Sequence, residues 1–348
     1  MKWNRIAAFA FFAAAAAAGV TATNAWAQDV TLRYSQWLPA NYALQKDIID
    51  PWIAEVERVT EGRVKVNKTP KVVGTVAGQY DVVVDGLADI ALIVPGYTPG
   101  RFPYVEGMEL PFLGDDPTAG SPVTQKTYDK FVAPTGEFKD IVVLSMFRGT
   151  SAHFVVKDKT LNSLNDVKGL KLRSPQLAVS TALELMGAVP ITKPMSEVYE
   201  LASNGTIDGG VIPLDTTLAF NLPGVLNKYI EAPGGLASTV VIIGMSPAAW
   251  EKIPAKDQDA IKSVSGLTLA TNAGKAYSAS LKDAYAKVEG LGMKIETVSD
   301  EFLSSIKSVL TPIRTDWIKM AKEKGLPDPE AMLTFFETEY AAAPKAEK

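Results

Sequence analysis

Apolar stretches typical of strands alternate with amphipathic stretches typical of helices along most of this chain, and this alternation constrains the fold more than any other feature. The first pair consists of residues 30–34 and residues 42–60, where Ile48, Trp52 and Val56 recur at helical spacing. Such alternation predicts an α/β protein, in which helices cover a sheet. Further strands are expected at residues 64–66, 90–94, 141–147, 171–173, 189–191, 209–212 and 240–245, and further helices at residues 76–85, 179–186 and 197–203.

The length of the chain and two of its stretches indicate how these elements are organised. At 348 residues the chain exceeds the size that one hydrophobic core usually supports, so we expect two domains. The aliphatic run 239–245 is dense enough to be a central strand that is buried on both faces. Residues 256–288 predict a long helix, with breaks only at Gly266 and Gly274, that could bridge the two domains.

The first 27 residues have the pattern of a secretory signal peptide. Lys2 and Arg5 precede an apolar run over residues 6–20, and small residues precede a cleavage site after Ala27. A membrane anchor is the alternative, but the run is shorter than the ~20 residues that a bilayer span needs. At the other end, residues 341–348 are rich in Ala, Lys and Glu and are expected to be disordered.

The composition excludes several classes of protein. An exported chain without cysteine has no disulfides and no thiol chemistry. The formal net charge of −4 argues against a nucleic-acid partner, because neutralising phosphates requires a clustered basic surface. The sequence contains neither a phosphate-binding loop nor a glycine motif for dinucleotides, so we expect no cofactor.

The sequence offers little for catalysis or for metal binding. Its one histidine, His153, belongs to no nucleophile elbow, and no second histidine completes a catalytic triad. We therefore interpret His153 as a structural polar residue and expect no enzymatic activity. Metal binding is also disfavoured, because His and Cys ligands are missing and Asp115 and Asp116 are better explained as a loop that caps a helix.

Arg173 is the strongest candidate for a binding residue. It ends the short strand 171–173, two residues before Pro175. Open α/β sheets bind ligands at the carboxyl ends of their strands. A guanidinium in that place is a permanent positive charge whose planar fork fits the two oxygens of a carboxylate. The alternative is a structural ion pair with Asp208 or Glu197.

Arg148 is a second candidate. It follows the apolar run 141–147 and directly precedes Gly149, which indicates the end of a strand. In that position its side chain would also emerge at a carboxyl strand end, where it would suit a second anionic or hydroxyl group of the ligand. The alternative is a surface contact.

A series of motifs carries a family resemblance. Residues 86–90 (GLADI), 96–103 (GYTPGRFP) and 109–112 (ELPF) precede the stretch 156–175 that contains Arg173, and residues 204–209 (NGTIDG) follow it. In content and order these motifs resemble those of the solute-binding proteins of TRAP transporters, the DctP family. The similarity extends from about residue 30 to the C-terminal helices.

This resemblance implies a two-lobed periplasmic binding protein fold, with hinge strands and a long helix that spans both lobes. We expect the first lobe to comprise residues 28–152 and 238–280, and the second to comprise residues 153–237 and 281–340. In this family the arginine at the position of Arg173 binds the carboxylate of the substrate. The family's receptors dock on a membrane permease with a small and a large subunit, and they are most often monomers.

Six further residues are expected to line the pocket, because each follows a predicted strand or begins a helix beside the cleft. For Trp37 the alternative is a place in the core, and for Gln79 and Tyr97 it is a helix face or a packed ring. The chain departs from the family at Leu214 and Asp215, where an aromatic residue and a glutamate are common, and this departure leaves the identity of the ligand open. The six residues are Trp37, Gln79, Tyr97, Pro213, Asp215 and Phe220.

The sequence therefore predicts a periplasmic receptor for a small organic acid. A C4-dicarboxylate, a 2-oxo acid, an aromatic acid and a sugar acid would all satisfy one arginine. Three other classes remain as alternatives: a receptor for an ABC importer or a sensor kinase, a secreted enzyme acting on small carboxylates, and a structural protein of the cell envelope. The TRAP-type motifs oppose the first, and the missing nucleophile and base oppose the second.

Overall fold

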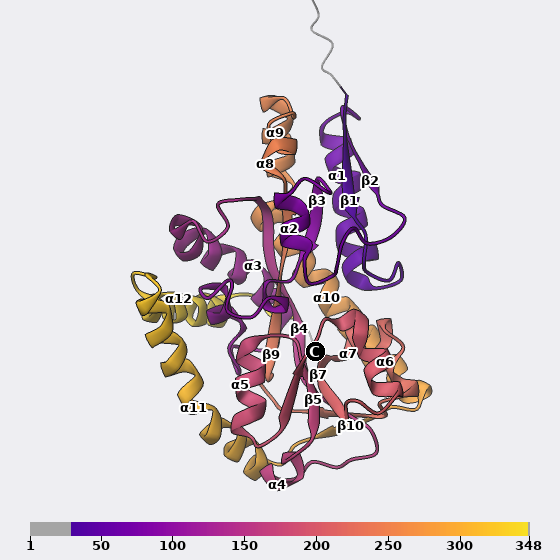
Figure 1. Ribbon diagram of the computed structural model, residues 1–348, viewed down its shortest axis with the longest axis vertical. Helices are drawn as coiled ribbons and strands as arrows, with labels where there is room; N and C mark the ends of the chain where they lie inside the picture. The colour runs from indigo at the N-terminus through magenta and orange to yellow at the C-terminus, as the bar shows by residue number, and fades with distance from the viewer. Residues whose placement is uncertain (1–28, 347–348) are drawn as a thin grey trace, which may run out of the picture.

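The computed structural model describes residues 29–346 and shows a mixed α/β protein built around a ten-stranded sheet (Figure 1). The α/β class predicted from the alternation of elements is therefore confirmed. The expected signal peptide, residues 1–27, lies outside the described residues. The strands are β1 Val30–Ser35, β2 Val64–Lys68, β3 Ile90–Ile93, β4 Val142–Val156, β5 Lys171–Ser174, β6 Val189–Thr192, β7 Gly209–Pro213, β8 Lys228–Glu231, β9 Ala237–Met245 and β10 Lys294–Thr297.

Strands β4 and β9 run through the middle of the sheet and join its two halves (Figure 1). The strand order is β2-β1-β3-β9-β4-β7-β5-β6, and β8 pairs with the far end of β4 and with β10. The antiparallel pairing of β4 with β9 extends from Val142 to Ala152, and β7 and β8 flank β4 as far as Val156. With 15 residues, β4 is much longer than the usual ~5–6 residues of a strand and belongs to both halves.

The strand predicted to end before Gly149 does not end there. Strand β4 continues through this glycine, and its register against β9 shifts between Arg148 and Ser151. An extra residue on one strand of an antiparallel pair is a β-bulge, which changes the faces on which the following side chains lie. As a result, Arg148 and Ser151 both contact the carbonyl of Gly114, although side chains three residues apart face opposite sides of a regular strand.

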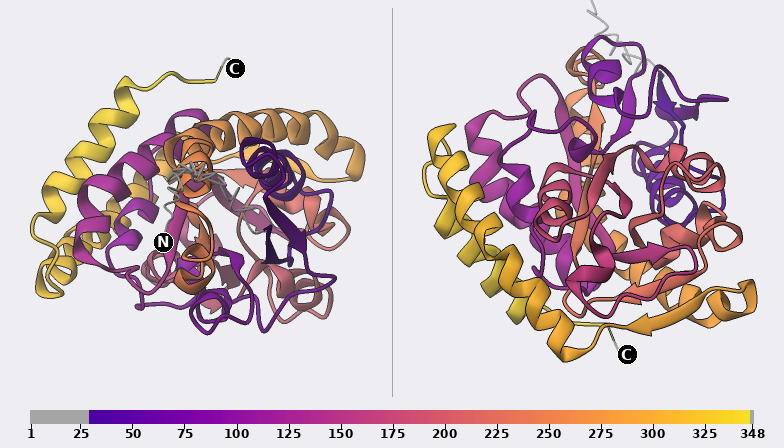
Figure 2. Two further views of the ribbon diagram at one scale, coloured as in Figure 1. Left: turned by 90° about the horizontal axis from the view of Figure 1, so that it is seen from above. Right: turned by 60° about the horizontal axis from the view of Figure 1, so that its bottom comes forward.

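The helices cover both faces of the sheet (Figures 1 and 2). They are α1 Asp50–Val59, α2 Gln79–Val84, α3 Pro117–Thr127, α4 Leu164–Val167, α5 Leu177–Leu185, α6 Val198–Ser203, α7 Leu214–Ala219, α8 Pro247–Trp250, α9 Ala255–Ser263, α10 Gly266–Val288, α11 Asp300–Glu323 and α12 Pro329–Ala342.

The long helix predicted over residues 256–288 is two helices, α9 and α10. The chain turns at Val264 and Ser265, and Gly266 has a φ of +52°, which a residue with a side chain rarely adopts. Helix α10 still spans both halves of the protein, as predicted. Near Gly274, where a Cβ would lie 2.5 Å from the carbonyl oxygen of Pro117, it packs tightly on α3.

Within residues 29–346, three clusters of buried hydrophobic side chains stabilise the fold. One lies around β1, β3 and the first half of α10, with Trp52, Ile243 and Tyr277 among its members. A second lies around β7 and the last turns of α10, where Tyr229 and Val288 are buried. The third cluster joins residues of both halves to α11 and α12. Helix α10 therefore contributes to the cores of both halves.

The C-terminal helices α11 and α12 lie along one edge of the molecule (Figure 2). Helix α11 packs against α5, whereas α12 packs against α3. The segment expected to be disordered begins within helix α12. Helix α12 extends to Ala342, and the N–H of Ala346 donates to Asp116 at 2.7 Å, because the loop before α3 offers this carboxylate as an acceptor.

Candidate functional site

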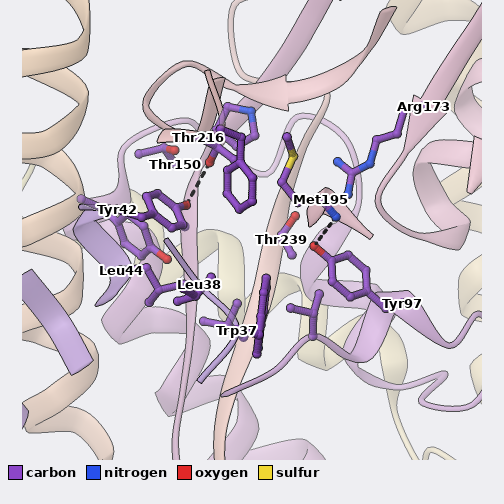
Figure 3. Close-up of a pocket in the computed structure, with 16 residues that line it drawn as sticks. Trp37, Leu38, Tyr42, Leu44, Tyr97, Thr150, Arg173, Met195, Thr216 and Thr239 are labelled. Carbon is purple, nitrogen blue, oxygen red and sulfur yellow. Dashed lines mark hydrogen bonds between the residues drawn. The ribbon is translucent and has the colours of Figure 1, made fainter. Parts of the chain in front are cut away.

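A pocket of about 60 Å³ lies where the two halves of the protein meet. The loop after β1, the loop after β3, both central strands, β5, α7 and α10 all contribute to its walls (Figure 3). It is mostly apolar and contains a few polar side chains, which is typical of a small-molecule site. The residues that line it are Trp37, Leu38, Tyr42, Leu44, Val94, Tyr97, Gly149, Thr150, Arg173, Met195, Pro213, Thr216, Phe220, Thr239, Val241 and Tyr277.

Arg173 supplies the positive charge of the pocket. It lies on β5 and is only 2% exposed. Its Nε donates to the carbonyl of Lys193 at 2.9 Å, and one terminal nitrogen lies 3.5 Å from the carbonyl of Val211. These backbone contacts fix the direction of the guanidinium.

Arg173 forms no ion pair with a carboxylate of residues 29–346. The two acids considered as its partners are engaged elsewhere. Asp208 accepts from the backbone N–H of Lys171, and Glu197 pairs with Lys193. Burial lowers the pKa of Arg173 from its ordinary value, while the phenol of Tyr97 partly opposes the shift. An anionic ligand would compensate this buried charge.

Aromatic rings form much of the pocket wall. Trp37 is oriented by a hydrogen bond from its indole N–H to the carbonyl of Leu92, and its ring centroid lies 6.4 Å from that of Tyr97. The backbone N–H of Met195 donates to the Tyr97 hydroxyl at 3.2 Å. On another wall, Phe220 packs edge-on against Tyr42. Such an arrangement suits a flat apolar ligand body.

A second polar group of side chains lies across the pocket from Arg173. Figure 3 shows Tyr42, Thr150 and Thr216 on one side, Arg173 on the other, and Trp37 and Thr239 between them. The hydroxyls of Tyr42 and Thr216 are hydrogen-bonded at 2.9 Å. Burial raises the pKa of Tyr42 well above its ordinary value, so this phenol is neutral. The pocket therefore has one charged end and one hydroxyl-rich end.

Asp215 lies behind the hydroxyl-rich end and does not itself line the pocket. It is 4% exposed, and its Oδ1 accepts a hydrogen bond of 2.6 Å from the hydroxyl of Thr150. Burial raises the pKa of Asp215 to about 6, with the Thr150 hydroxyl opposing the shift. At neutral pH the carboxylate is thus largely ionised and holds the Thr150 hydroxyl in a fixed orientation.

The structure brings five of the eight predicted site residues together. These are Trp37, Tyr97, Arg173, Pro213 and Phe220. Asp215 contacts the pocket only through Thr150. Gln79 does not line the pocket, because its side-chain amide donates to the carbonyls of Val73 and Thr75 and so fixes the loop that leads into α2.

Arg148 does not line the pocket either. It pairs with Val240 of β9, so it lies on the face of the sheet opposite to the pocket residue Val241, where it is 2% exposed. One terminal nitrogen donates to the carbonyls of Leu113 and Gly114, and its Cζ lies 4.8 Å from the ring centroid of Phe336. It is buried rather than on the surface, because α3 and α12 enclose it, and it lies outside this pocket.

Sequence reasoning missed much of the hydroxyl-rich end. Thr239 and Val241 alternate along β9 as residues of one strand face do, so the run 239–245 contained a signal for them. Thr150 follows Gly149 within the bulge, and no sequence pattern indicated its direction. The missed residues that line the pocket with polar or aromatic groups are Tyr42, Thr150, Thr216, Thr239 and Tyr277.

Neither a metal site nor a membrane span is found within residues 29–346. No three side chains of His, Asp or Glu gather there in an arrangement that could hold a metal ion. No helix in this part of the chain combines the length and the apolar character needed to cross a membrane.

The family model of bacterial extracellular solute-binding proteins, family 7 (DctP), matches residues 34–321. The chain belongs to this family. The match covers both halves of the sheet, both central strands and the pocket. The family resemblance inferred from the motifs around Arg173 is therefore confirmed.

Solved structures agree with this assignment. A TRAP periplasmic solute-binding protein from Bordetella bronchiseptica, with bound (R)- and (S)-mandelate, is 31% identical, has a TM-score of 0.86 and is matched over 90% of this chain and 99% of its own. A TRAP solute-binding protein of a marine metagenome, in complex with 3-hydroxybenzoate, is 29% identical with a TM-score of 0.85, over 91% and 100% of the two chains. The predicted two-lobed fold is thus confirmed.

Among curated proteins, the outer membrane transporter protein TsaT of Comamonas testosteroni is 26% identical over 317 residues. The match covers 91% of this chain and 93% of TsaT.

Proposed function

We propose that this protein is a periplasmic receptor that binds a small organic acid at Arg173 and delivers it to the small and large membrane subunits of a TRAP transporter. The observation that carries the proposal is the state of Arg173. This guanidinium is buried at the wall of a pocket and has no carboxylate partner in the described part of the chain. A buried cation without a counterion favours an anionic guest.

The ligand we propose is a carboxylate with a flat, largely apolar body. Trp37, Tyr97 and Phe220 would contact that body, while Arg173 takes the carboxylate. The mandelates and the 3-hydroxybenzoate found in the relatives support this choice, because each combines one carboxylate with an aromatic ring. Among the organic acids considered from the sequence, an aromatic acid therefore fits best.

Binding would require the two halves to separate and close again. The pocket measures about 60 Å³, whereas an apolar cavity that holds a benzene molecule measures ~150 Å³. We propose as first lobe residues 28–152 and 238–280, and as second lobe residues 153–237 and 281–340, with α12 packing back onto the first. A ligand that contacts both lobes stabilises the closed form, and this form would dock on the permease.

The test is a thermal-shift screen against benzoate, mandelate, succinate, pyruvate and glucuronate, followed by calorimetry on the best acid. We expect the aromatic acids to raise the melting temperature most. A structural envelope protein would show no shift with any acid, and a secreted enzyme would consume the acid, which chromatography of the mixture detects. Either result would contradict the proposal. Gel filtration with light scattering tests the monomeric state expected from the resemblance.

A further inference from the structure

Thr150, with Asp215 behind it, lies at the end of the pocket opposite Arg173. An ionised carboxylate can only accept hydrogen bonds, so in the 2.6 Å contact with Asp215 Oδ1 the proton belongs to Thr150. The single proton of this hydroxyl is therefore committed. What Thr150 offers the pocket is a pair of acceptor sites on its oxygen.

Three other hydroxyls at this end add little donor capacity. Tyr42 is hydrogen-bonded to Thr216 and also to Tyr277, so these contacts use two of the three hydroxyl protons. A single donor remains among the three residues. Among the residues that line the pocket Arg173 is the only cation, and it lies across the pocket from this group (Figure 3).

The buried charge of Asp215 also acts on whatever occupies this end. Its Oδ2 has no hydrogen-bond partner within the described chain, and although the backbone N–H groups of Asp215 and Thr216 oppose the rise of its pKa, the negative charge is compensated only in part. A second carboxylate on the ligand would be separated from Asp215 by only one hydroxyl group. In a poorly solvated site, like charges at such a distance oppose each other strongly.

We propose that Thr150 and Asp215 form a specificity device that accepts a hydroxyl group at the far end of the ligand and rejects a second carboxylate there. A ligand hydroxyl donates to Thr150 and is stabilised by the negative charge behind it. A ligand carboxylate finds an acceptor that it cannot bond and a charge of its own sign. This inference rests on the proposed function and narrows its ligand class to monocarboxylates with a hydroxyl at the end remote from the acid.

The experiment compares matched ligands by calorimetry at pH 7.5. The set is benzoate, its 2-, 3- and 4-hydroxy derivatives, and the three benzenedicarboxylates, so each ring position carries hydrogen, hydroxyl or carboxylate. For wild-type protein we expect at least one hydroxybenzoate to bind ~10-fold tighter than benzoate, the effect of one good hydrogen bond. We expect the matching dicarboxylate to bind ~10-fold or more weaker than benzoate.

Two nearly isosteric variants separate the effect of the hydroxyl acceptor from the effect of the buried charge. Thr150→Val removes the acceptor, so the affinity for the best hydroxybenzoate should come to within ~2-fold of the affinity of the same variant for benzoate. Asp215→Asn removes the charge, so the penalty on the dicarboxylate should shrink ~5-fold or more. The matched controls are Thr127→Val and Asp257→Asn, which change a buried threonine and a buried aspartate outside the pocket and should leave all ratios unchanged.

The outcomes separate this inference from the function on which it rests. If benzoate binds but hydroxyl and carboxylate substituents make no difference in the wild type, the specificity device is refuted and the receptor function stands. The same holds if the preferences persist in Thr150→Val and Asp215→Asn. If no carboxylate binds at all, both proposals fail. The wild-type ratios need no variant, so poor folding of either variant does not prevent a decision.

Discussion

The same sheet contains two buried arginines, Arg173 and Arg148, whose guanidinium groups have different surroundings. Both lie on strands, both are 2% exposed, and neither pairs with a carboxylate within residues 29–346. Arg148 is enclosed by the protein itself: its guanidinium meets the carbonyls of Leu113 and Gly114 and the rings of Phe336 and Tyr340. Arg173 is fixed by backbone carbonyls but still faces the pocket.

This contrast teaches that burial of an arginine does not by itself indicate function. The interior can compensate a cation with carbonyl dipoles and aromatic faces, as it does at Arg148. What distinguishes Arg173 is the pocket that its guanidinium lines. The same substitution at the two positions should therefore have opposite consequences for binding and for stability.

The largest expected effect is on binding by Arg173→Met. This change keeps the length of the side chain and removes its charge, so calorimetry should show a loss of ~100-fold or more in affinity for the best acid, about 2.7 kcal/mol. Without ligand, the free energy of unfolding should change by no more than about 1 kcal/mol, because a poorly compensated buried charge is also removed. A large loss of stability with unchanged affinity would place Arg173 with Arg148 and remove the contrast.

Arg148→Met should have the reverse effect. Its loss leaves the Leu113 and Gly114 carbonyls without their guanidinium donor and removes the contacts with two rings, so the free energy of unfolding should fall by about 2–4 kcal/mol. Urea denaturation measures this quantity. The affinity for the best acid should stay within ~2-fold of wild type, since the side chain is outside the pocket. Selective weakening of a dianionic ligand would instead restore a ligand-binding role for Arg148.

The buried Asp215 behind the hydroxyl-rich end of the pocket should make the free energy of unfolding depend on pH. Burial raises the pKa of Asp215 from 3.8 to about 6 in the folded protein, so the folded state binds this proton more tightly than the unfolded chain. The stabilisation is complete below pH ~4 and is lost as the pH rises through about 6. Relative to Asp215→Asn, wild type should lose about 2–3 kcal/mol of unfolding free energy between pH 4 and pH 7. A difference that does not change with pH would show that the carboxylate is not perturbed.

The smallest effect is expected from Tyr97→Phe. The variant keeps the ring but loses the hydroxyl that accepts from the Met195 N–H and lies beside Arg173. Affinity should fall ~3-fold, the value of one modest hydrogen bond. The unliganded melting temperature should hardly move. An effect as large as that of Arg173→Met would mean that Tyr97, and not only the arginine, contacts the carboxylate.

The fold and the positive end of the site could be read from the sequence because their signals are local. Arg173 ends a short strand just before Pro175, and the family motifs around it occur in order along the chain. The alternation of elements sufficed for the α/β class. The dense run 239–245 correctly indicated a central strand, since β9 covers Ala237–Met245.

The errors arose where partners distant in the sequence decide the local structure. Gly149 looked like the end of a strand, but pairing with β9 carries β4 through it, and Arg148, opposite Val240, lies on the face of the sheet away from the pocket residue Val241. The break between α9 and α10 depends on the backbone of Gly266 at positive φ. Thr150 and Tyr277 reach the pocket from a bulge and from a distant helix, and no spacing in the chain relates them to Arg173.

The continuity of β4 has a mechanical consequence. If the lobes were connected only by flexible loops, one lobe could rotate almost freely relative to the other. Here a 15-residue strand, hydrogen-bonded on both flanks, runs through both halves. Any widening of the pocket must therefore bend and twist this strand, whose regular pairing is interrupted by the bulge beside Thr150.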